Sequence, residues 1–315
     1  MRHVSMFCAG LALCLCWVVS AESTEYNLEQ LLAFYDYDTS QALNPVETFV
    51  DSFQHFTQYH ITFQSAHDET VTSYLFLPRP ELFGPPPYPA ILYLHGYGGD
   101  KEMDSLYIEV LGNLLWTLEQ PYALMGLDAQ YHGEREVPDR DMYSLNFVQD
   151  RGGLAQTIID HRRAIDYLAT RGDMDLSQIH VMGGSMGGIL GGILIGAEPR
   201  IVAASLIVGG GDWTQLVALS ALPPAYPMRE ALNHHYETLP RYFDPVDPMY
   251  LIGFAAGRGA VQMHNGIYDT IVPTGQILFD AAGEPKEIYW YPCGHDVGDY
   301  YEEILAHTLR WFSEY

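Results

Sequence analysis

The chain has 315 residues, of which 48% are hydrophobic and 17% are charged, a balance that suits a globular protein with a large core. Its formal net charge is −25, and lysine occurs only at positions 101 and 286. Because so negative a field repels nucleic acid and anionic membranes, both are excluded as expected partners.

Residues 1–21 are predicted to be a secretory signal peptide. A short basic start precedes an apolar run from Met6 to Val19, which is too short to span a membrane comfortably. Small residues then allow cleavage after Ala21. An uncleaved anchor is the alternative. The mature chain, residues 22–315, is therefore expected to be secreted or periplasmic, with no membrane attachment after the signal is removed.

Cysteine usage follows from this prediction. Cys8, Cys14 and Cys16 lie within the predicted signal peptide, and only Cys293 remains after cleavage. The mature chain is then expected to have no intramolecular disulfide, so that its stability comes from the core.

The first part of the mature chain is expected to flank a sheet. Residues 22–58 are acidic and aromatic, with a helix starting at about 28–34, and should pack on the edge of the core. Residues 59–65 and 70–77 alternate between apolar and polar side chains, which indicates a β-hairpin.

From residue 90 the pattern changes to strands that alternate with helices. Apolar runs predict strands at 90–94, 122–127, 179–182, 201–208, 260–264 and 287–291. Helices are expected at 103–119, 154–169 and 300–312. Together with the hairpin, these segments predict an α/β fold with a mostly parallel eight-stranded sheet, covered by helices on both faces.

One connection is far longer than the others. The segment from Asp212 to about Phe254 follows a predicted core strand and is rich in proline and aromatic residues. Its position predicts a lid over the carboxyl edge of the sheet, and a structural insertion far from any site is the alternative. Trp213 and Tyr226 in this segment, together with His95, are candidate substrate-binding residues.

A glycine-rich turn is the centre of the predicted site. Gly183-Gly184-Ser185-Met186-Gly187 matches the pattern G-x-S-x-G between a predicted strand and a helix. On such a turn the serine hydroxyl projects above the sheet edge, and the flanking glycines allow strand and helix to approach closely. Ser185 is therefore the candidate nucleophile, although a turn with an idle serine gives the same pattern.

A serine needs a base to remove its proton, and a carboxylate to orient that base. His295 follows the last predicted strand and is the best candidate base, with His95, His132, His234, His235 and His264 as rivals. Asp269 follows the strand before it and is the candidate acid. Asp212 is the rival acid, whereas Asp296 is too close to His295 in sequence.

The negative charge that develops on the attacked carbonyl needs two preorganised donors. The backbone N–H of Met186, directly after the nucleophile, is the first candidate. The second is the backbone N–H of Tyr97, in the turn His95-Gly96-Tyr97-Gly98-Gly99 after the strand at 90–94. A plain glycine turn is the alternative interpretation of this second motif.

Six motifs together resemble the α/β-hydrolase superfamily. They are His95 to Gly99, Asp128 to Arg135, Asp160 to Leu168 followed by Asp175, Gly183 to Gly187, Asp269 to Pro273, and Gly294-His295. Within the superfamily the chain is similar to the dienelactone-hydrolase, acetyl-xylan-esterase and prolyl-oligopeptidase-like branch, over about residues 59–315. The resemblance implies hydrolysis of carboxylic esters through an acyl-enzyme, with no metal or cofactor. Dienelactone hydrolases use a cysteine nucleophile, and here the position is Ser185.

These observations predict a secreted serine esterase that acts on a small-molecule ester. The catalytic residues are expected to be Ser185, Asp269 and His295, in the order typical of α/β-hydrolases. A peptidase of short peptides would use the same groups, and a catalytically inactive binding module on this fold is the non-enzyme alternative. The natural acyl group and the oligomeric state are left open by the sequence.

Overall fold

The structure, a computed structural model, describes residues 27–102, 105–232 and 242–315. The predicted signal peptide lies outside the described residues, as do two of the rival histidines, His234 and His235. The signal peptide therefore stays a prediction. Within the described part of the chain, no helix is both long enough and apolar enough to cross a membrane.

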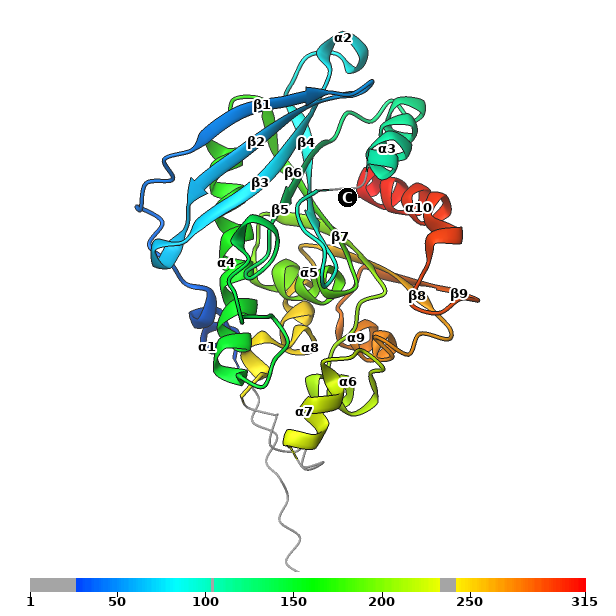
Figure 1. The fold of residues 1–315 in the computed structure, drawn as a ribbon. Coiled ribbons are helices and arrows are strands. Elements are labelled where there is room, and N and C mark those ends of the chain that lie inside the picture. The colour runs from blue at the N-terminus through cyan, green and yellow to red at the C-terminus, as the bar shows by residue number, and fades with distance from the viewer. Residues whose placement is uncertain (1–26, 103–104, 233–241) are drawn as a thin grey trace, which may run out of the picture.

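The strands in the described residues form one nine-stranded sheet (Figure 1). They are β1 (Val46–Ser52), β2 (Phe56–Gln64), β3 (Thr70–Pro78), β4 (Tyr88–Leu94), β5 (Ala123–Leu127), β6 (Met174–Gly184), β7 (Ile201–Ile207), β8 (Ala260–Gly266) and β9 (Lys286–Tyr291). Their spatial order is β1-β2-β3-β5-β4-β6-β7-β8-β9. Pairing is antiparallel from β1 to β5 and parallel from β5 to β9, which confirms the predicted mostly parallel sheet.

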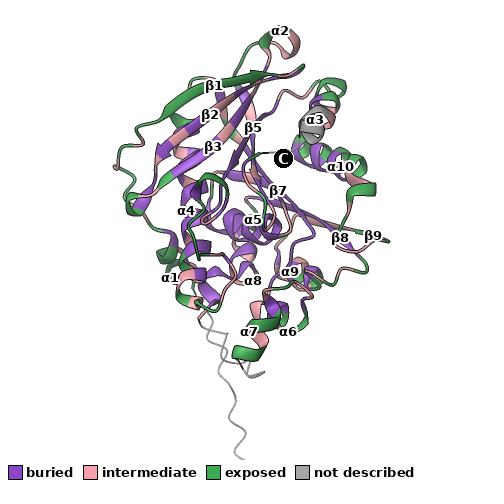
Figure 2. Cartoon of the chain, in the orientation of Figure 1, coloured by how far each residue is buried: buried purple, intermediate pink, exposed green. Residues whose placement is uncertain are grey.

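Strand β1 is the difference from the predicted eight strands. Val46, Phe49, Val50 and Phe53 have the spacing of a helical face, so the alternation of a strand is missing from the sequence. Every residue of β1 is exposed, as Figure 2 shows along the outer edge of the sheet. Its conformation is supported by antiparallel backbone pairing with β2, with a register shift between Phe49 and Asp51. A strand without a buried face carries no hydrophobic period by which it could be recognised.

Helices cover both faces of the sheet (Figure 1). They are α1 (Leu28–Leu32), α2 (Pro80–Phe83), α3 (Ser105–Thr117), α4 (Phe147–Thr170), α5 (Met186–Ala197), α6 (Trp213–Leu219), α7 (Ala225–Ala231), α8 (Pro248–Leu251), α9 (Gly275–Ala281) and α10 (Tyr301–Glu314). Helices α3 and α10 lie on one face, and α1, α4, α5 and α8 lie on the other.

The central strands are buried on both sides. In β4, Ile91 packs in the cluster formed with α3 and α10, whereas its neighbour Leu92 packs in the cluster formed with α4 and α5. In β6, Met182 packs in the cluster with α3 and α10, and its neighbour Val181 packs in the cluster with α4 and α5. Successive side chains of a strand point to opposite faces, so a strand covered on both faces must be apolar at every position. This explains the unbroken apolar runs in the sequence.

Helix α4 begins earlier than the expected 154–169. Asn146 caps its first turn, with its side-chain oxygen accepting a hydrogen bond from the N–H of Gln149 at 3.3 Å. Gly152 and Gly153 follow within the helix and weaken its helical signal. A Cβ at Gly153 would come within 2.8 Å of the Tyr131 ring, so the glycine allows the helix to approach the loop after β5.

Candidate active site

Ser185 lies on the sharp turn between β6 and α5. Its backbone adopts φ 57° and ψ −116°, a conformation that side-chain-bearing residues rarely occupy. The turn is held by a hydrogen bond of 2.8 Å from the Ser185 N–H to the Ile207 carbonyl. A Cβ at Gly183 would overlap the Gly187 carbonyl, and one at Gly187 would overlap the Leu94 carbonyl. The predicted glycines are therefore required by backbone packing around the serine.

His295 connects Ser185 to Asp269. Its Nε2 lies 2.8 Å from the Ser185 Oγ, and its Nδ1 lies 2.8 Å from Asp269 Oδ2. The second Asp269 oxygen accepts hydrogen bonds from the N–H groups of Ile271 and Val272, at 2.8 and 3.0 Å. Because the carboxylate accepts a hydrogen bond from the Nδ1–H group, Nε2 is left as the acceptor for the serine hydroxyl. The structure thus brings the three predicted residues into one hydrogen-bonded chain.

The three hydrogen-bonded side chains are buried to different extents. The Asp269 side chain is 4% exposed, whereas that of His295 is 23% exposed. The carboxylate is therefore fixed within the protein, and the imidazole reaches the solvent side. This arrangement lets His295 exchange a proton with a group that arrives from, or departs to, the solvent.

The rival acids have other partners. Asp212 caps α6, where its side chain accepts the N–H of Gln215 at 3.2 Å. Asp296 is exposed and accepts the N–H of Gly298 at 2.9 Å. Among the described residues, the His295 imidazole is hydrogen-bonded to the carboxylate of Asp269.

His95 has a structural position. Its Nε2 accepts the N–H of Ala129 at 3.0 Å, so Nδ1 carries the proton and donates to the Gly96 carbonyl at 2.8 Å. Burial lowers the pKa of His95, which keeps the imidazole neutral. It joins the loops after β4 and β5, and it is absent from the cavity beside Ser185. Its predicted contact with substrate is therefore not seen.

The two other rival histidines that the structure describes, His132 and His264, also have other partners. His132 lies beside His95, and its Nδ1 is 2.9 Å from the Gln130 carbonyl. His264 is buried between Gln262 and Tyr291, and burial lowers its pKa to about 3. The low pKa makes His264 a weak base, and both of its ring nitrogens are hydrogen-bonded to side chains other than that of Ser185.

The candidate oxyanion donors flank Ser185. Met186 is the first residue of α5, a helix of 12 residues, and the amides of a first helical turn have no acceptor within the helix. Tyr97 lies in the turn closed by the N–H of Gly99 and the carbonyl of Gly96, at 3.0 Å. Both Tyr97 and Met186 line the same cavity as Ser185. Their role as donors stays a prediction.

The sequence matches no family model, and no curated protein is similar to it in sequence. Among solved structures, it is similar to an acetyl xylan esterase from Paenibacillus sp. R4, with 18% identity and a TM-score of 0.72, covering 92% of this chain and 100% of that one. Acetyl xylan esterase 1 from Thermoanaerobacterium sp. JW/SL YS485 gives 16% identity and a TM-score of 0.72, with coverage of 91% and 93%.

An acylaminoacyl peptidase from Pyrococcus horikoshii is also similar, with 14% identity, a TM-score of 0.58, and coverage of 83% of this chain and 40% of that one. The chain has the α/β-hydrolase fold. This confirms the predicted fold class, and at these identities the likeness concerns the fold alone.

Within this α/β-hydrolase fold, a buried carboxylate holds the loop that carries Tyr97. Asp128, directly after β5, accepts the backbone N–H and the Nζ of Lys101, each at 2.9 Å. It also accepts the Thr72 hydroxyl of β3 at 2.6 Å. Lys101 is 2% exposed and follows the turn at Gly96–Gly99 by two residues. Asp128 and His95 together therefore fix the loop after β4 against the loop after β5.

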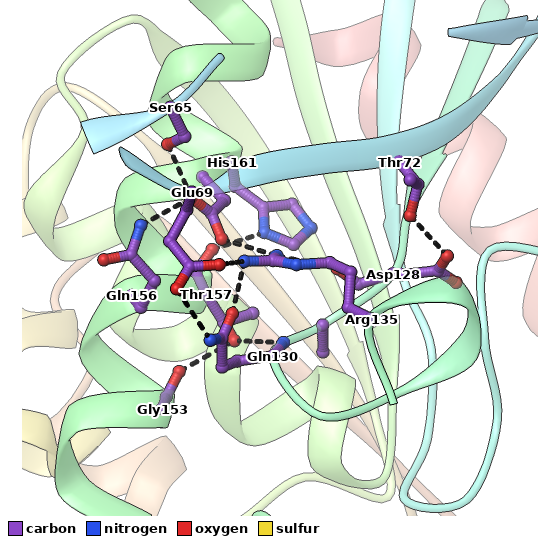
Figure 3. A network of polar contacts seen from close by, with 12 residues as sticks. Ser65, Glu69, Thr72, Asp128, Gln130, Arg135, Gly153, Gln156, Thr157 and His161 are labelled. Carbon is purple, nitrogen blue, oxygen red and sulfur yellow. Dashed lines mark hydrogen bonds and ion pairs between the residues drawn. The ribbon is translucent and has the colours of Figure 1, made fainter. Parts of the chain in front are cut away.

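A second part of the network reaches α4 (Figure 3). The Arg135 guanidinium donates to Asp160 at 2.6 Å, to Glu69 at 3.1 Å and to the Asp128 carbonyl at 3.2 Å. Asp160 also accepts the Ser65 hydroxyl at 2.6 Å. The motif from Asp128 to Arg135 thus shapes the loop after β5, by means of a buried ion pair with α4.

Replacing Asp160 by asparagine should lower the free energy of unfolding by about 3 kcal/mol, because Arg135 loses its buried counter-ion. The side chains of Arg135 and Asp160 are 5% and 1% exposed. Glu69→Gln is the matched control, since that side chain is 35% exposed and its loss should cost less than about 1 kcal/mol. Urea unfolding monitored by circular dichroism measures both. Equal losses in the two variants would contradict the assignment of Asp160 as the main partner.

An apolar cavity opens beside Ser185. It is lined by the following residues: Tyr97, Tyr143, Ser185, Met186, Ile189, Trp213, Leu216, Val217, Ser220, Leu222, Pro224, Ala225, Met228, Ile271 and Val272. Helices α6 and α7, with the loop between them, supply more than half of this lining. The first part of the predicted lid therefore lies beside Ser185.

The two substrate-binding candidates in the lid lie in different places. Trp213 lines the cavity, as predicted. Tyr226 is 54% exposed and does not line it; its ring instead lies 4.5 Å from the Arg229 guanidinium carbon. On α7, Ala225 and Met228 line the cavity instead.

The described residues at the end of the insertion, 242–254, pack on the core. A Cβ at Gly196 of α5 would overlap the Leu251 carbonyl of α8, so these two helices are in close backbone contact. The buried carboxylate of Asp247 accepts the N–H groups of Asp212 and Trp213, at 3.0 and 2.8 Å. It thereby joins the start of the insertion to its later part. Of the predicted lid at 212–254, the segment around α6 and α7 lines the cavity beside Ser185, and the described residues 242–254 pack on the core; the lid itself stays a prediction.

Proposed function

We propose that the protein is a serine esterase. The observation that carries the proposal is the hydrogen-bonded chain Asp269–His295–Ser185, at the mouth of an apolar cavity. A hydroxyl on a strained turn, a base at 2.8 Å and a buried carboxylate behind that base are the parts needed for acyl transfer. The fold similarity to two acetyl xylan esterases supports a hydrolase of this kind.

The proposed reaction has two halves. Ser185 Oγ attacks the ester carbonyl while His295 Nε2 takes its proton, and Asp269 stabilises the imidazolium. The amides of Met186 and Tyr97 bind the negative oxygen, and the positive end of α5 adds to this stabilisation. His295 then returns the proton to the leaving alcohol. In the second half, water activated by His295 releases the acid from Ser185.

Peptide hydrolysis is the alternative on the same groups. Among the residues that the structure describes, those lining the cavity include no carboxylate that could bind the amino terminus of a peptide. An acyl group of apolar character fits such walls better than a charged peptide end does. An inactive binding module is disfavoured because both hydrogen bonds that link Asp269 to His295 and His295 to Ser185 are present.

The purified protein should react with a fluorophosphonate probe at Ser185, because this serine is paired with a base. Mass spectrometry of the labelled peptide identifies the residue, and heat-denatured protein is the control. In parallel, p-nitrophenyl esters and peptide p-nitroanilides compare the two reaction classes. Labelling of Ser185 with faster anilide cleavage would favour the peptidase. No labelling in the folded protein would refute the nucleophile and with it the esterase.

A further inference from the structure

A second apolar cavity adjoins the one beside Ser185. It has a volume of about 340 Å³ and is lined by Tyr143, Phe147, Asp150, Leu154, Trp213, Val217, Met228 and Phe243. Four of these residues also line the first cavity: Tyr143, Trp213, Val217 and Met228. They therefore form the wall between the two spaces. Three of the four lie on α6 and α7 of the predicted lid.

Trp213 of this wall is anchored by a hydrogen bond from its Nε1 to the Val246 carbonyl, whereas Tyr143 and Met228 have no such anchor among the described residues. The Tyr143 hydroxyl is buried and has no hydrogen-bond partner among the described residues, so turning the ring breaks no such bond. Met228 is unbranched, and methionine adapts its shape to its neighbours. Asp150 is the one carboxylate lining the second cavity, and both its oxygens accept hydrogen bonds from Ser144, at 2.9 and 2.7 Å. The second cavity is thus apolar toward a ligand.

The position of His295 shows which half of an ester the first cavity receives. The leaving alcohol takes its proton from His295, so it must lie beside the imidazole. His295 does not line the cavity, whereas Ser185, Met186 and Tyr97 do. The imidazole is 23% exposed and faces the open side. The alcohol therefore departs toward solvent, and the acyl group occupies the cavity.

We propose that the two cavities form one acyl-binding channel and that Ser185 prefers esters of medium-length, unbranched apolar acids to acetyl esters. The proposal rests on the serine esterase function proposed above. The lining of the first cavity extends over α5, α6 and α7 and is largely apolar, whereas an acetyl group has a single methyl group to bury. A chain of about eight carbons would bury its methylenes against Leu216, Val217 and Met228, where each added methylene strengthens binding about fourfold.

The first test is a series of p-nitrophenyl esters from acetate to decanoate, in which only the acyl chain changes. We expect kcat/KM to rise at least tenfold from acetate to octanoate. A steady fall from acetate onward would overturn the channel while leaving the esterase intact. If no ester in the series were cleaved and Ser185 were not labelled by a fluorophosphonate, the proposed function itself would fail.

A second series keeps the acetyl group and lengthens an aliphatic alcohol. We expect its kcat/KM to vary less than that of the acyl series, because the alcohol side is open to solvent. A stronger dependence on alcohol length than on acyl length would overturn the assignment of the acyl group to the cavity.

Substitutions at Val217 test the wall directly. Val217→Phe places a ring where the two cavities meet and should lower the octanoate-to-acetate ratio of kcat/KM about tenfold. Leu219→Phe is the matched control, since this residue lies on the same helix and is 59% exposed, and its ratio should equal that of the parent protein. Val217→Ala widens the passage and should raise the decanoate-to-octanoate ratio, which provides a test even if the phenylalanine variant does not fold. Unchanged ratios in a folded variant would refute the channel.

Discussion

Replacing Ser185 by alanine should lower kcat for ester hydrolysis by about 10⁶-fold, the loss expected when a triad nucleophile is removed. Only the hydroxyl group is removed, so the backbone contacts that hold the turn are retained. These contacts are the hydrogen bond from the Ser185 N–H to the Ile207 carbonyl and the close approach of Gly187 to the Leu94 carbonyl. The variant should therefore fold with the parent's circular dichroism spectrum. Stopped assays with p-nitrophenyl octanoate at high enzyme concentration measure the residual rate.

Ser177→Ala is the control for the serine substitution. This serine lies on the same strand, β6, but is exposed and bonds to Asp175 at 2.6 Å, away from the cavity. Its loss should leave kcat within twofold of the parent value. A Ser185→Ala protein with more than about 1% of parental activity would show that another residue is the nucleophile.

Replacing Asp269 by asparagine should reduce kcat about 10⁴-fold. The Oδ1 position still accepts the Ile271 and Val272 N–H groups, so the loop is retained. An amide at the Oδ2 position, however, can donate to Nδ1 of His295. This selects the tautomer whose proton lies on Nε2, where it can no longer accept the serine proton. Steady-state kinetics with a single ester measures the loss.

Asp212→Asn is the matched control for the acid. Asp212 caps α6 and has a left-handed backbone at φ 62°, and asparagine serves both purposes as well as aspartate does. We therefore expect kcat to stay within about twofold of the parent value. A loss of several orders of magnitude at Asp212, with Asp269→Asn active, would exchange the roles assigned to the two carboxylates.

Local patterns were sufficient to predict the parts of the site that depend on backbone chemistry. The glycines around Ser185 are required by contacts within a few residues and with one adjacent strand, so their spacing is visible in the sequence. His295 and Asp269 each follow a buried strand, and strands in parallel order bring such loops to one edge of the sheet. The positions of Ser185, His295 and Asp269 at this edge of the sheet could therefore be predicted from the order of the strands.

Features that depend on distant contacts could not be predicted in this way. The apolar residues of β1 have a helical spacing, and its pairing with β2 is supplied by backbone groups that leave no side-chain pattern. His95 is a motif histidine, and only its contact with Ala129, 34 positions further along the chain, shows that it connects two loops. The division of the insertion between cavity lining and support depends on the packing of α8 against α5.

The contact at Asp247 has a consequence for how this protein can be altered. The Asp247 carboxylate accepts the N–H groups of Asp212 and Trp213, so the two ends of the segment between Trp213 and Val246 lie next to each other. The entropy of closing such a segment changes slowly with its length. Within that segment, the Ser220 hydroxyl and the Ala221 N–H donate to the Ile271 and Thr270 carbonyls beside Asp269. A replacement segment of another length or composition would therefore have to keep these two contacts for Asp269 to stay in place.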